Sequence, residues 1–548
     1  MTFTFGMMYP ACSQRSFALR KPSTLMSKKT IPFLMVAIFV VSLSIRLYRL
    51  DGQTLECDEL YTIPAATGHQ YVYLSSEANS TTARMPITTS EYRDLIKPEA
   101  GVGLSSVRGV LKRNVHLPLY FYVMHYWIGW LGNSEWQLRF PSAFFGALTA
   151  VLIFALGKEL FSFFVGLVSS ILLAFSPEQI YFAQQARMYP LLMLLLVSST
   201  YLLVLARKHS RKNWFYVGYV LVSVAGLYTH YEYVFCLAAQ VFYIGILTRE
   251  GRQNWKQWLA AYAAIGLAFL PWVLISRAQK QTSGEIIAWV NGSLPANLVL
   301  TELLTKTARL VSVPEMPFGW ISVLLALVLL IVGGVSLAAN RETLLLLLSW
   351  IVFPVLGVVL MDNLLGTRAI GITRYWLVIS PALYLLISVG IERIKRPEVQ
   401  IALVAILGGL FVSAALLTAQ GKLRAKPDHH KELAEFVDTQ ADASGRTVVL
   451  TEGLNSLPLA LAYYSKREMN ILRHKWVVDQ LATRSFRDLT GGASEIVLLV
   501  SGRSVATKLL EENGFHLDGK PVQYGHVMSA HYILGNSPAP NTGPGFER

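Results

Sequence analysis

Long apolar stretches, separated by short polar segments, make up most of the first 420 residues of the chain. A helix needs about 20 mostly apolar residues to cross the hydrocarbon core of a bilayer. Eleven stretches without Asp, Glu, Lys or Arg approach that length, at 30–45, 140–157, 160–177, 188–206, 213–231, 233–248, 257–276, 316–340, 343–361, 375–391 and 399–421. The pattern therefore predicts an α-helical polytopic membrane protein with about eleven spans.

A further uncharged segment at 117–132 has a short apolar centre and many aromatic residues. Basic residues are expected in cytoplasmic loops. The short basic loops all fall inside if this segment does not span and the basic tail at 1–29 is cytoplasmic. These loops contain Lys158, Arg207, Lys208, Arg211, Lys212, Arg249, Arg252, Lys256, Arg341, Arg393, Lys395 and Arg396. We therefore interpret 117–132 as an aromatic helix that lies in the outer membrane interface.

Three regions are then extracytoplasmic: a first loop at 50–138, a second loop at 277–315, and the C-terminal segment from residue 421. Within the second loop, Asn, Gly and Pro at 286–301 predict irregular structure. The C-terminal segment alternates helical and β-rich patterns, which predicts a small α/β domain with its own core. The predicted parts are a basic cytoplasmic tail at 1–29, a transmembrane module at 30–420, an extracytoplasmic α/β domain at 421–535 and a flexible tail at 536–548.

The composition excludes two other classes of protein. Of 548 residues, 53% are hydrophobic and 15% are charged, whereas soluble domains carry about 25% charged residues and disordered chains are far less apolar. The net charge of +14 would suit nucleic acid. The excess basic residues lie mainly in short membrane loops, so no nucleic-acid partner is expected. The cysteines, Cys12, Cys57 and Cys236, are too few and too scattered to predict a disulfide framework or a zinc site.

The first candidate for chemistry is the acidic pair Asp58 and Glu59, shortly after the first span. Ionisable residues near membrane depth are costly and therefore mark functional sites. Two adjacent carboxylates at a membrane exit can act as a general base or hold a divalent cation. The alternative is a solvated loop that enters a helix, since the first turn of a helix favours acidic residues.

Arginines lie on the same predicted outer side. Arg187, between two spans, can clamp a phosphate through the paired donors of its guanidinium group. The alternative is an arginine that extends to the membrane interface. Arg368 and Arg374 lie at the outer end of a span, against the positive-inside bias, and this placement favours an anionic ligand.

Two histidines share that side. His230 lies in an outer turn among tyrosines, and His116 precedes the aromatic segment. Each is either a metal ligand or proton carrier, or an imidazole that simply forms hydrogen bonds with its neighbours. The candidate metal ligands are therefore Asp58, His116 and His230.

Several short sequence motifs around these residues, and their order along the chain, resemble those of the polytopic GT-C glycosyltransferases. The resemblance is to the bacterial relatives of protein O-mannosyltransferases and of the lipid A aminoarabinose transferase. Asp58-Glu59 lies where the family has an acidic pair in its first loop. The other matching phrases are His116-Leu117-Pro118-Leu119-Tyr120, Ser134–Ala143, Gln184-Gln185-Ala186-Arg187-Met188-Tyr189, Tyr228-Thr229-His230-Tyr231, Arg374-Tyr375 and Lys426-Pro427-Asp428. Leu117 replaces a proline of the family pattern. Gln185 replaces an acid, which leaves that loop one carboxylate poorer for any metal ion.

The resemblance implies transfer of a sugar from a polyprenyl-phosphate carrier to an acceptor, with inversion at the anomeric carbon. It implies that Asp58 is the general base, with Glu59 as a second catalytic residue that, like His116, would orient the acceptor or the base. The implied donor-phosphate residues are Arg187, Arg374, Tyr189 and Tyr375, and the implied pocket residues are His116, Tyr120, Gln184, His230 and Tyr231. The aromatic segment 117–132 would form the floor of the donor groove, and the loop 277–315 would close over the substrates.

Two other classes remain as alternatives. A secondary transporter of an anionic or sugar-like solute also has many spans, but it should place paired charges or broken helices near the bilayer midplane. The predicted spans carry no acids or bases through their centres. A membrane scaffold needs no cluster of acid, histidine and arginine on one face. The resemblance implies a bacterial inner-membrane location with the N-terminus in the cytoplasm. It leaves open the acceptor, which is a protein, glycolipid or polysaccharide, and the need for a divalent metal ion.

Overall fold

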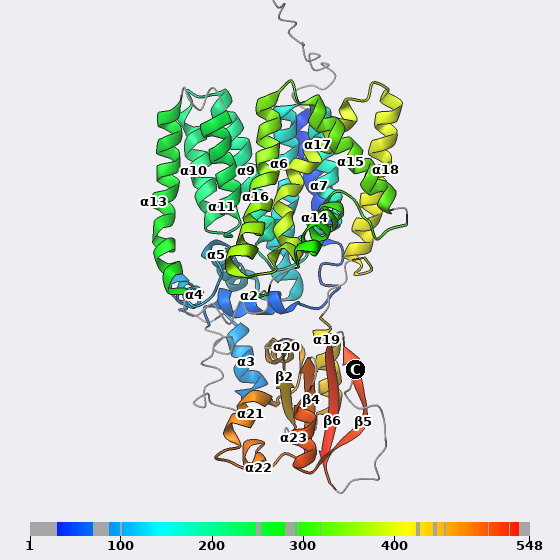
Figure 1. Cartoon of the computed structure of the whole chain (residues 1–548). Coiled ribbons are helices and arrows are strands. Elements are labelled where there is room, and N and C mark those ends of the chain that lie inside the picture. The colour runs from blue at the N-terminus through cyan, green and yellow to red at the C-terminus, as the bar shows by residue number, and fades with distance from the viewer. Residues whose placement is uncertain are drawn as a thin grey trace, which may run out of the picture.

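The computed structural model describes residues 30–69, 87–98, 101–247, 254–279, 291–292, 295–317, 319–423, 428–441, 447–453, 456–501, 504–524 and 526–535. These residues form a bundle of apolar helices with a smaller α/β region below one end (Figure 1). Helix α2 (Cys57–Thr67) lies across that end of the bundle, between the two parts. The predicted tails at 1–29 and 536–548 lie outside the described residues, as do Lys426 and Pro427.

Each predicted apolar stretch corresponds to a helix of the bundle. The helices are α1 (Thr30–Leu47), α6 (Glu135–Leu160), α7 (Phe163–Phe175), α8 (Pro177–Ala183), α9 (Tyr189–Lys208), α10 (Asn213–Leu227), α11 (Tyr233–Phe242), η3 (Tyr243–Leu247), α13 (Trp255–Gln279), α15 (Gly319–Ser336), α16 (Arg341–Leu365), η6 (Thr373–Ile379), α17 (Ser380–Glu392) and α18 (Pro397–Ala419). Among the described residues, eight helices are long and apolar enough to cross a membrane, and the bent pair α7 and α8 makes a ninth. The predicted class of polytopic helical membrane protein is confirmed, and the count of eleven spans stays a prediction.

The bend between α7 and α8 has a local cause. The two helices meet at 55°, and Ser176 at the break has an extended backbone, with φ −61° and ψ 122°. A residue that precedes proline rarely adopts helical φ and ψ angles, and Pro177 suits the first turn of a new helix. The Ser176 hydroxyl then accepts a hydrogen bond from the Gln179 N–H, which caps α8.

Helix α17 forms the centre of the bundle, since residues 380–391 are all buried. Its contact with α15 depends on glycine. A Cβ atom on Gly390 would lie 2.2 Å from the Leu329 carbonyl oxygen, and one on Gly333 would lie 2.2 Å from that of Leu386. Small residues let helix backbones approach closely inside a membrane, and the two glycines allow this close contact between α15 and α17.

Shorter helices lie at the end of the bundle and beside the α/β region (Figure 1). They are α3 (Thr89–Ile96), α4 (Leu104–Leu111), α5 (Pro118–Leu131), α14 (Ala296–Val311) and η5 (Ala369–Gly371). The predicted aromatic helix at 117–132 is α5, which packs against α2 and α4. Its outward face exposes Tyr126 and Trp130, as expected for a helix at a membrane interface. Its depth in a membrane stays a prediction.

The prediction of irregular structure at 286–301 is wrong from Ala296 onward, because α14 begins there, after Pro295. Residues 280–290 and 293–294 lie outside the described residues. The segment after Pro295 buries Ala308 and Leu310 on one side and exposes Leu300 and Leu304 on the other. The nearby Asn, Gly and Pro masked the start of this helix in the sequence.

The α/β region is built on one mixed sheet with strand order β1-β3-β2-β4-β6-β5. The strands are β1 (Ile87–Thr88), β2 (Val448–Glu452), β3 (Asn470–Arg473), β4 (Glu495–Ser501), β5 (Phe515–Tyr524) and β6 (Val527–Leu534). Strand β2 is parallel to β3 and β4, with Val449 opposite Ile471 and Val497, and the remaining pairs are antiparallel. The helices are α19 (His430–Gln440), α20 (Leu457–Tyr464), α21 (His474–Gln480), α22 (Phe486–Leu489) and α23 (Ala506–Glu512).

The predicted small C-terminal α/β region is confirmed. The edge strand β1 is unexpected, because it belongs to the segment between α2 and α5 and pairs antiparallel with β3. Helix α3 follows directly and packs on α20. The boundaries assigned to the four predicted parts stay a prediction.

Candidate functional site

Three distant parts of the chain meet at Asp58, in the first turn of α2. Asp58 Oδ2 accepts a hydrogen bond from Arg374 Nη1 at 2.9 Å and forms an ion pair with Arg187 Nη2 at 3.7 Å. Arg187 precedes α9, and Arg374 lies in η6. The Asp58 side chain is 38% exposed, whereas that of Arg187 is 3% exposed. The carboxylate is therefore partly exposed, whereas the guanidinium group of Arg187 is buried.

Arg187 is held in place by several acceptors. Nη1 donates to the Asp58 carbonyl oxygen at 3.2 Å and to Thr62 Oγ1 at 3.3 Å. Nη2 lies 3.4 Å from His116 Nε2. The buried Nε has no hydrogen-bond partner among the described residues. Part of this guanidinium group is thus fixed by the protein, and one donor remains for a ligand.

Aromatic rings surround the two arginines. The guanidinium carbons of Arg187 and Arg374 each lie 5.9 Å from the ring centroid of Tyr189, and Arg374 also lies 5.7 Å from the Tyr375 ring. The His230 ring is 5.8 Å from Tyr189 and 6.1 Å from Tyr375. Cations over aromatic faces are stabilised without being neutralised, so both remain available to an anion.

The charges set the protonation of the groups outside the spans. Burial raises the pKa of Asp58, but the nearby positive charges of Arg187 and Arg374 outweigh this effect and hold the pKa below its usual value. Burial, reinforced by the Arg187 charge, lowers the pKa of His116 well below its usual value. The site therefore holds an ionised carboxylate and a neutral imidazole that accepts a hydrogen bond from Arg187.

Glu59 has a different environment from Asp58. It is fully buried, and Arg139 donates to both of its oxygens, at 2.8 and 3.0 Å. The same carboxylate accepts the backbone N–H groups of Ala186 at 2.8 Å and Glu56 at 3.0 Å. The Glu59 carboxylate therefore joins α2 to the segment that carries Arg187, and its predicted role in orienting the acceptor or the base stays a prediction.

The other predicted pocket residues lie around this centre. The Tyr120 hydroxyl is 2.9 Å from Ser142 Oγ, which in turn donates to the Arg187 carbonyl oxygen at 2.9 Å. Gln184 Nε2 donates to the carbonyl oxygens at the end of α1. Tyr231 is 38% exposed and accepts a hydrogen bond from the Trp272 indole. The structure thus brings together Asp58, Arg187, Arg374, His116, Tyr189, Tyr375 and His230, and it places Tyr120, Gln184 and Tyr231 at the margin.

Two acidic residues escaped the sequence reasoning. Glu56 Oε1 accepts hydrogen bonds from the Tyr181 hydroxyl at 2.8 Å and from Gln185 Nε2 at 2.9 Å. Glu232 is 4% exposed, and its Oε2 lies 3.8 Å from His230 Nδ1. Gln185 could have pointed to Glu56 in the sequence. It replaces an acid of the family pattern, and an amide at that position can donate a hydrogen bond to a neighbouring carboxylate.

The predicted metal candidates do not form one ligand group. Among the described residues, the group with suitable spacing is Cys57, Asp428 and His430, whose ligand atoms lie within 4.8 Å of one another. It differs from the predicted set of Asp58, His116 and His230. The expectation that no cysteine takes part in such a cluster rested on spacing along the chain, and the fold brings the three residues together across it.

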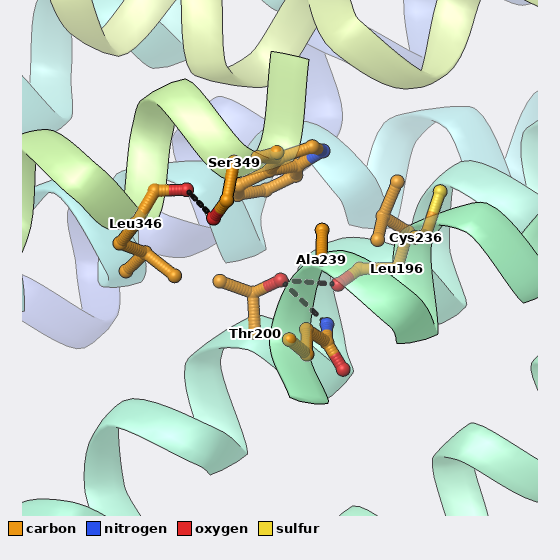
Figure 2. Close-up of a pocket in the computed structure, with 8 residues that line it drawn as sticks. Leu196, Thr200, Cys236, Ala239, Leu346 and Ser349 are labelled. Carbon is orange, nitrogen blue, oxygen red and sulfur yellow. Dashed lines mark hydrogen bonds between the residues drawn. The ribbon is translucent and has the colours of Figure 1, made fainter. Parts of the chain in front are cut away.

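A hollow inside the bundle, between α9, α11 and α16, lies apart from this site (Figure 2). Its polar groups are paired with one another: Thr200 Oγ1 donates to the Leu196 carbonyl oxygen, Gln240 Nε2 donates to Thr200, and Ser349 Oγ donates to the Leu346 carbonyl oxygen. None of its lining residues is among the predicted site residues.

The bundle of apolar helices, with an acid and two arginines at the end next to a small α/β region, has the fold of the GT-C glycosyltransferases. Residues 115–274 match the family described as dolichyl-phosphate-mannose-protein mannosyltransferase. No curated protein matches the chain in sequence.

The fold is similar to that of ArnT from Cupriavidus metallidurans. The apo structure of ArnT has a TM-score of 0.59 at 10% sequence identity, covering 92% of this chain and 98% of that chain. The structure of ArnT bound to undecaprenyl phosphate has a TM-score of 0.54 at 11% identity, with the same coverage of 92% and 98%. The predicted class, a polytopic glycosyltransferase of GT-C fold, is confirmed, and the transporter alternative is not favoured.

Proposed function

We propose that the protein transfers a sugar from a polyprenyl-phosphate carrier to an acceptor hydroxyl, with inversion at the anomeric carbon. The fold it shares with an undecaprenyl-phosphate-binding protein supports a lipid-borne phosphate donor. The observation that carries the proposal is the convergence of Arg374 and Arg187 on one oxygen of Asp58.

Each group has a step in this displacement. Asp58 takes the proton of the acceptor hydroxyl as its oxygen bonds to the anomeric carbon. The bond from that carbon to the phosphate oxygen breaks, and the electron pair leaves with the lipid phosphate. Arg187 and Arg374 neutralise the phosphate charge as it develops.

The ion pairs of Asp58 with Arg187 and Arg374 require the donor to bind before Asp58 acts as a base. Without donor, both arginines face the Asp58 carboxylate and hold its pKa low, which makes it a poor base. A phosphate that enters beside the arginines shares their charge. The pKa of Asp58 then rises toward its usual value, and the base becomes effective once the donor is in place.

The membrane determines where the lipid-linked donor meets the site. A carrier with an isoprenoid tail presents its phosphosugar at the bilayer interface, where α2 and α5 lie at the end of the bundle. We propose that this end is extracytoplasmic, in a bacterial inner membrane, with the N-terminus inside. Helix α5 forms the floor of the donor groove, and the segment 277–315 closes over the substrates. Residues 280–290 and 293–294 of that segment lie outside the described residues.

The direct test is sugar transfer by the purified protein from a labelled polyprenyl-phosphate sugar to a membrane extract of acceptors. We expect label in the acceptor fraction and release of free polyprenyl phosphate in equal amount. Sealed vesicles that accumulate a free sugar or anion, with no label transferred, would support the transporter instead.

Lysine at either arginine position should slow transfer. Lys keeps the charge of Arg187 or Arg374 but loses the planar pair of donors that fits a phosphate. We expect kcat/KM for the donor to fall on the order of 10²-fold in each variant, as for loss of one transition-state donor. Arg393→Lys, at an exposed position after α17, is the matched control. An unchanged kcat/KM in both site variants would contradict a phosphate role.

A further inference from the structure

A second cluster of polar side chains lies on the other side of Asp58, where α2 meets the C-terminal α/β region. Cys57 begins α2, while Asp428 and His430 lie at the start of the C-terminal region. Their ligand atoms lie within 4.8 Å of one another. Asp428 is 5% exposed and His430 is 1% exposed, and Cys57 is partly buried. None of the three takes part in the sugar-transfer chemistry proposed above.

His430 has the arrangement of a metal-binding histidine. Its Nδ1 is 2.8 Å from the Leu55 carbonyl oxygen, which can only accept a hydrogen bond, so Nδ1 carries the proton. The lone pair is then on Nε2, which is buried and has no hydrogen-bond partner among the described residues. Buried polar atoms are nearly always paired, and a histidine that binds a metal commonly donates its other nitrogen to a carbonyl oxygen.

Asp428 and Cys57 are also held in positions suited to binding a metal ion. Asp428 Oδ2 accepts the backbone N–H of Cys57 at 2.8 Å, which fixes the carboxylate and leaves Oδ1 for a ligand. The Cys57 thiol has Ser456 Oγ as a neighbour at 2.9 Å. His526 Nε2 lies 3.4 Å from Asp428 Oδ1, close to the separation of about 3.3 Å between two N/O ligands on a tetrahedral zinc ion with bonds of about 2.0–2.1 Å.

We propose that Cys57, Asp428 and His430 bind a zinc ion, with His526 available as a fourth ligand. One thiolate, one imidazole and one carboxylate suit a borderline metal such as Zn²⁺, whereas Mg²⁺ and Ca²⁺ prefer oxygen ligands alone. The ion would replace the Cys57 thiol proton, and it would satisfy the Nε2 lone pair of His430.

Such an ion would join two parts of the protein. Cys57 immediately precedes Asp58 in the first turn of α2, and the other ligands belong to the C-terminal region. A zinc ion there would fix the start of α2 to that region and hold the backbone that carries Asp58. This is a positioning role that leaves the displacement chemistry unchanged.

The test is Co²⁺ binding to the full-length protein in detergent after treatment with a chelator. We expect a sulfur-to-cobalt charge-transfer band and tetrahedral d–d bands in the wild type, displaced by Zn²⁺. Cys57→Ser should abolish the charge-transfer band. His430→Gln should weaken Zn²⁺ binding by more than the roughly 100-fold that loss of an outer hydrogen-bond partner of a ligand costs.

Matched controls separate this site from other thiols and imidazoles. Cys236→Ser changes a buried cysteine of α11, and His429→Gln changes the exposed neighbour of His430. Both should keep the wild-type spectrum. Zn²⁺ should also raise the melting temperature of the wild type with its concentration, and not that of Cys57→Ser. A wild type without a charge-transfer band, or a band that persists in Cys57→Ser, would overturn the proposal. These readouts do not depend on sugar transfer.

Discussion

Asparagine in place of Asp58 is expected to abolish sugar transfer while the protein still inserts and accumulates. The amide cannot accept the proton of the acceptor hydroxyl, and general bases contribute roughly 10²- to 10⁴-fold to a rate. The side chain keeps its size, and the first turn of α2 keeps its capping interactions through Glu56 and Glu59. The measurement is transfer from the labelled donor, made alongside the yield and melting temperature of each variant.

The control for this variant is Asp94→Asn, which removes an exposed carboxylate paired with Lys97. It should transfer at the wild-type rate. Asp58→Glu adds a second test, because it keeps the carboxylate but moves it by one methylene, and it should restore only part of the activity. Full transfer by Asp58→Asn would rule out Asp58 as the base.

The second large effect is expected at Glu59. Glu59→Gln leaves Arg139, which is 1% exposed, without its counter-charge. Removal of one partner from a buried ion pair costs about 3–5 kcal/mol. We therefore expect a marked drop in melting temperature and in yield. Transfer should fall as well, because the Glu59 carboxylate positions the segment that carries Arg187.

Glu91→Gln is the matched control, since Glu91 forms the same kind of capping box in α3 but at an exposed position. Its loss should cost about 1 kcal/mol or less. A direct catalytic role for Glu59 predicts a different outcome, in which Glu59→Gln folds with wild-type stability and loses only activity.

The apolar stretches predicted the helices of the bundle because a span in lipid must be a long helix without charged residues, and such a stretch is visible in the local sequence. The same rule placed the ionisable residues outside the spans. The placement of Asp58, Arg187 and Arg374 at or beyond the ends of spans was therefore readable, although they are far apart along the chain. The motifs that resemble the family indicated that these three residues belong to one site, which their spacing along the chain alone could not show.

The features that were missed depend on contacts across the chain. Arg139 stood in a matching phrase. Nothing local shows that its side chain donates to Glu59 and to the carbonyl oxygens of Leu50, Gln53 and Thr54. The cluster of Cys57 with Asp428 is another case, since a separation of 371 residues hides it from any spacing rule. The start of α14 was missed for a local reason, because Pro295 both ends a loop and begins a helix.

The two-residue strand β1 has a practical consequence for work on the C-terminal region. Thr89, directly after this strand, donates to the carbonyl oxygen of Arg467, 378 residues further along the chain. A fragment that starts at residue 421 would leave β3 as a bare edge, and bare edges pair with other copies. Such a fragment should aggregate unless the 87–96 peptide is fused to it or supplied in trans.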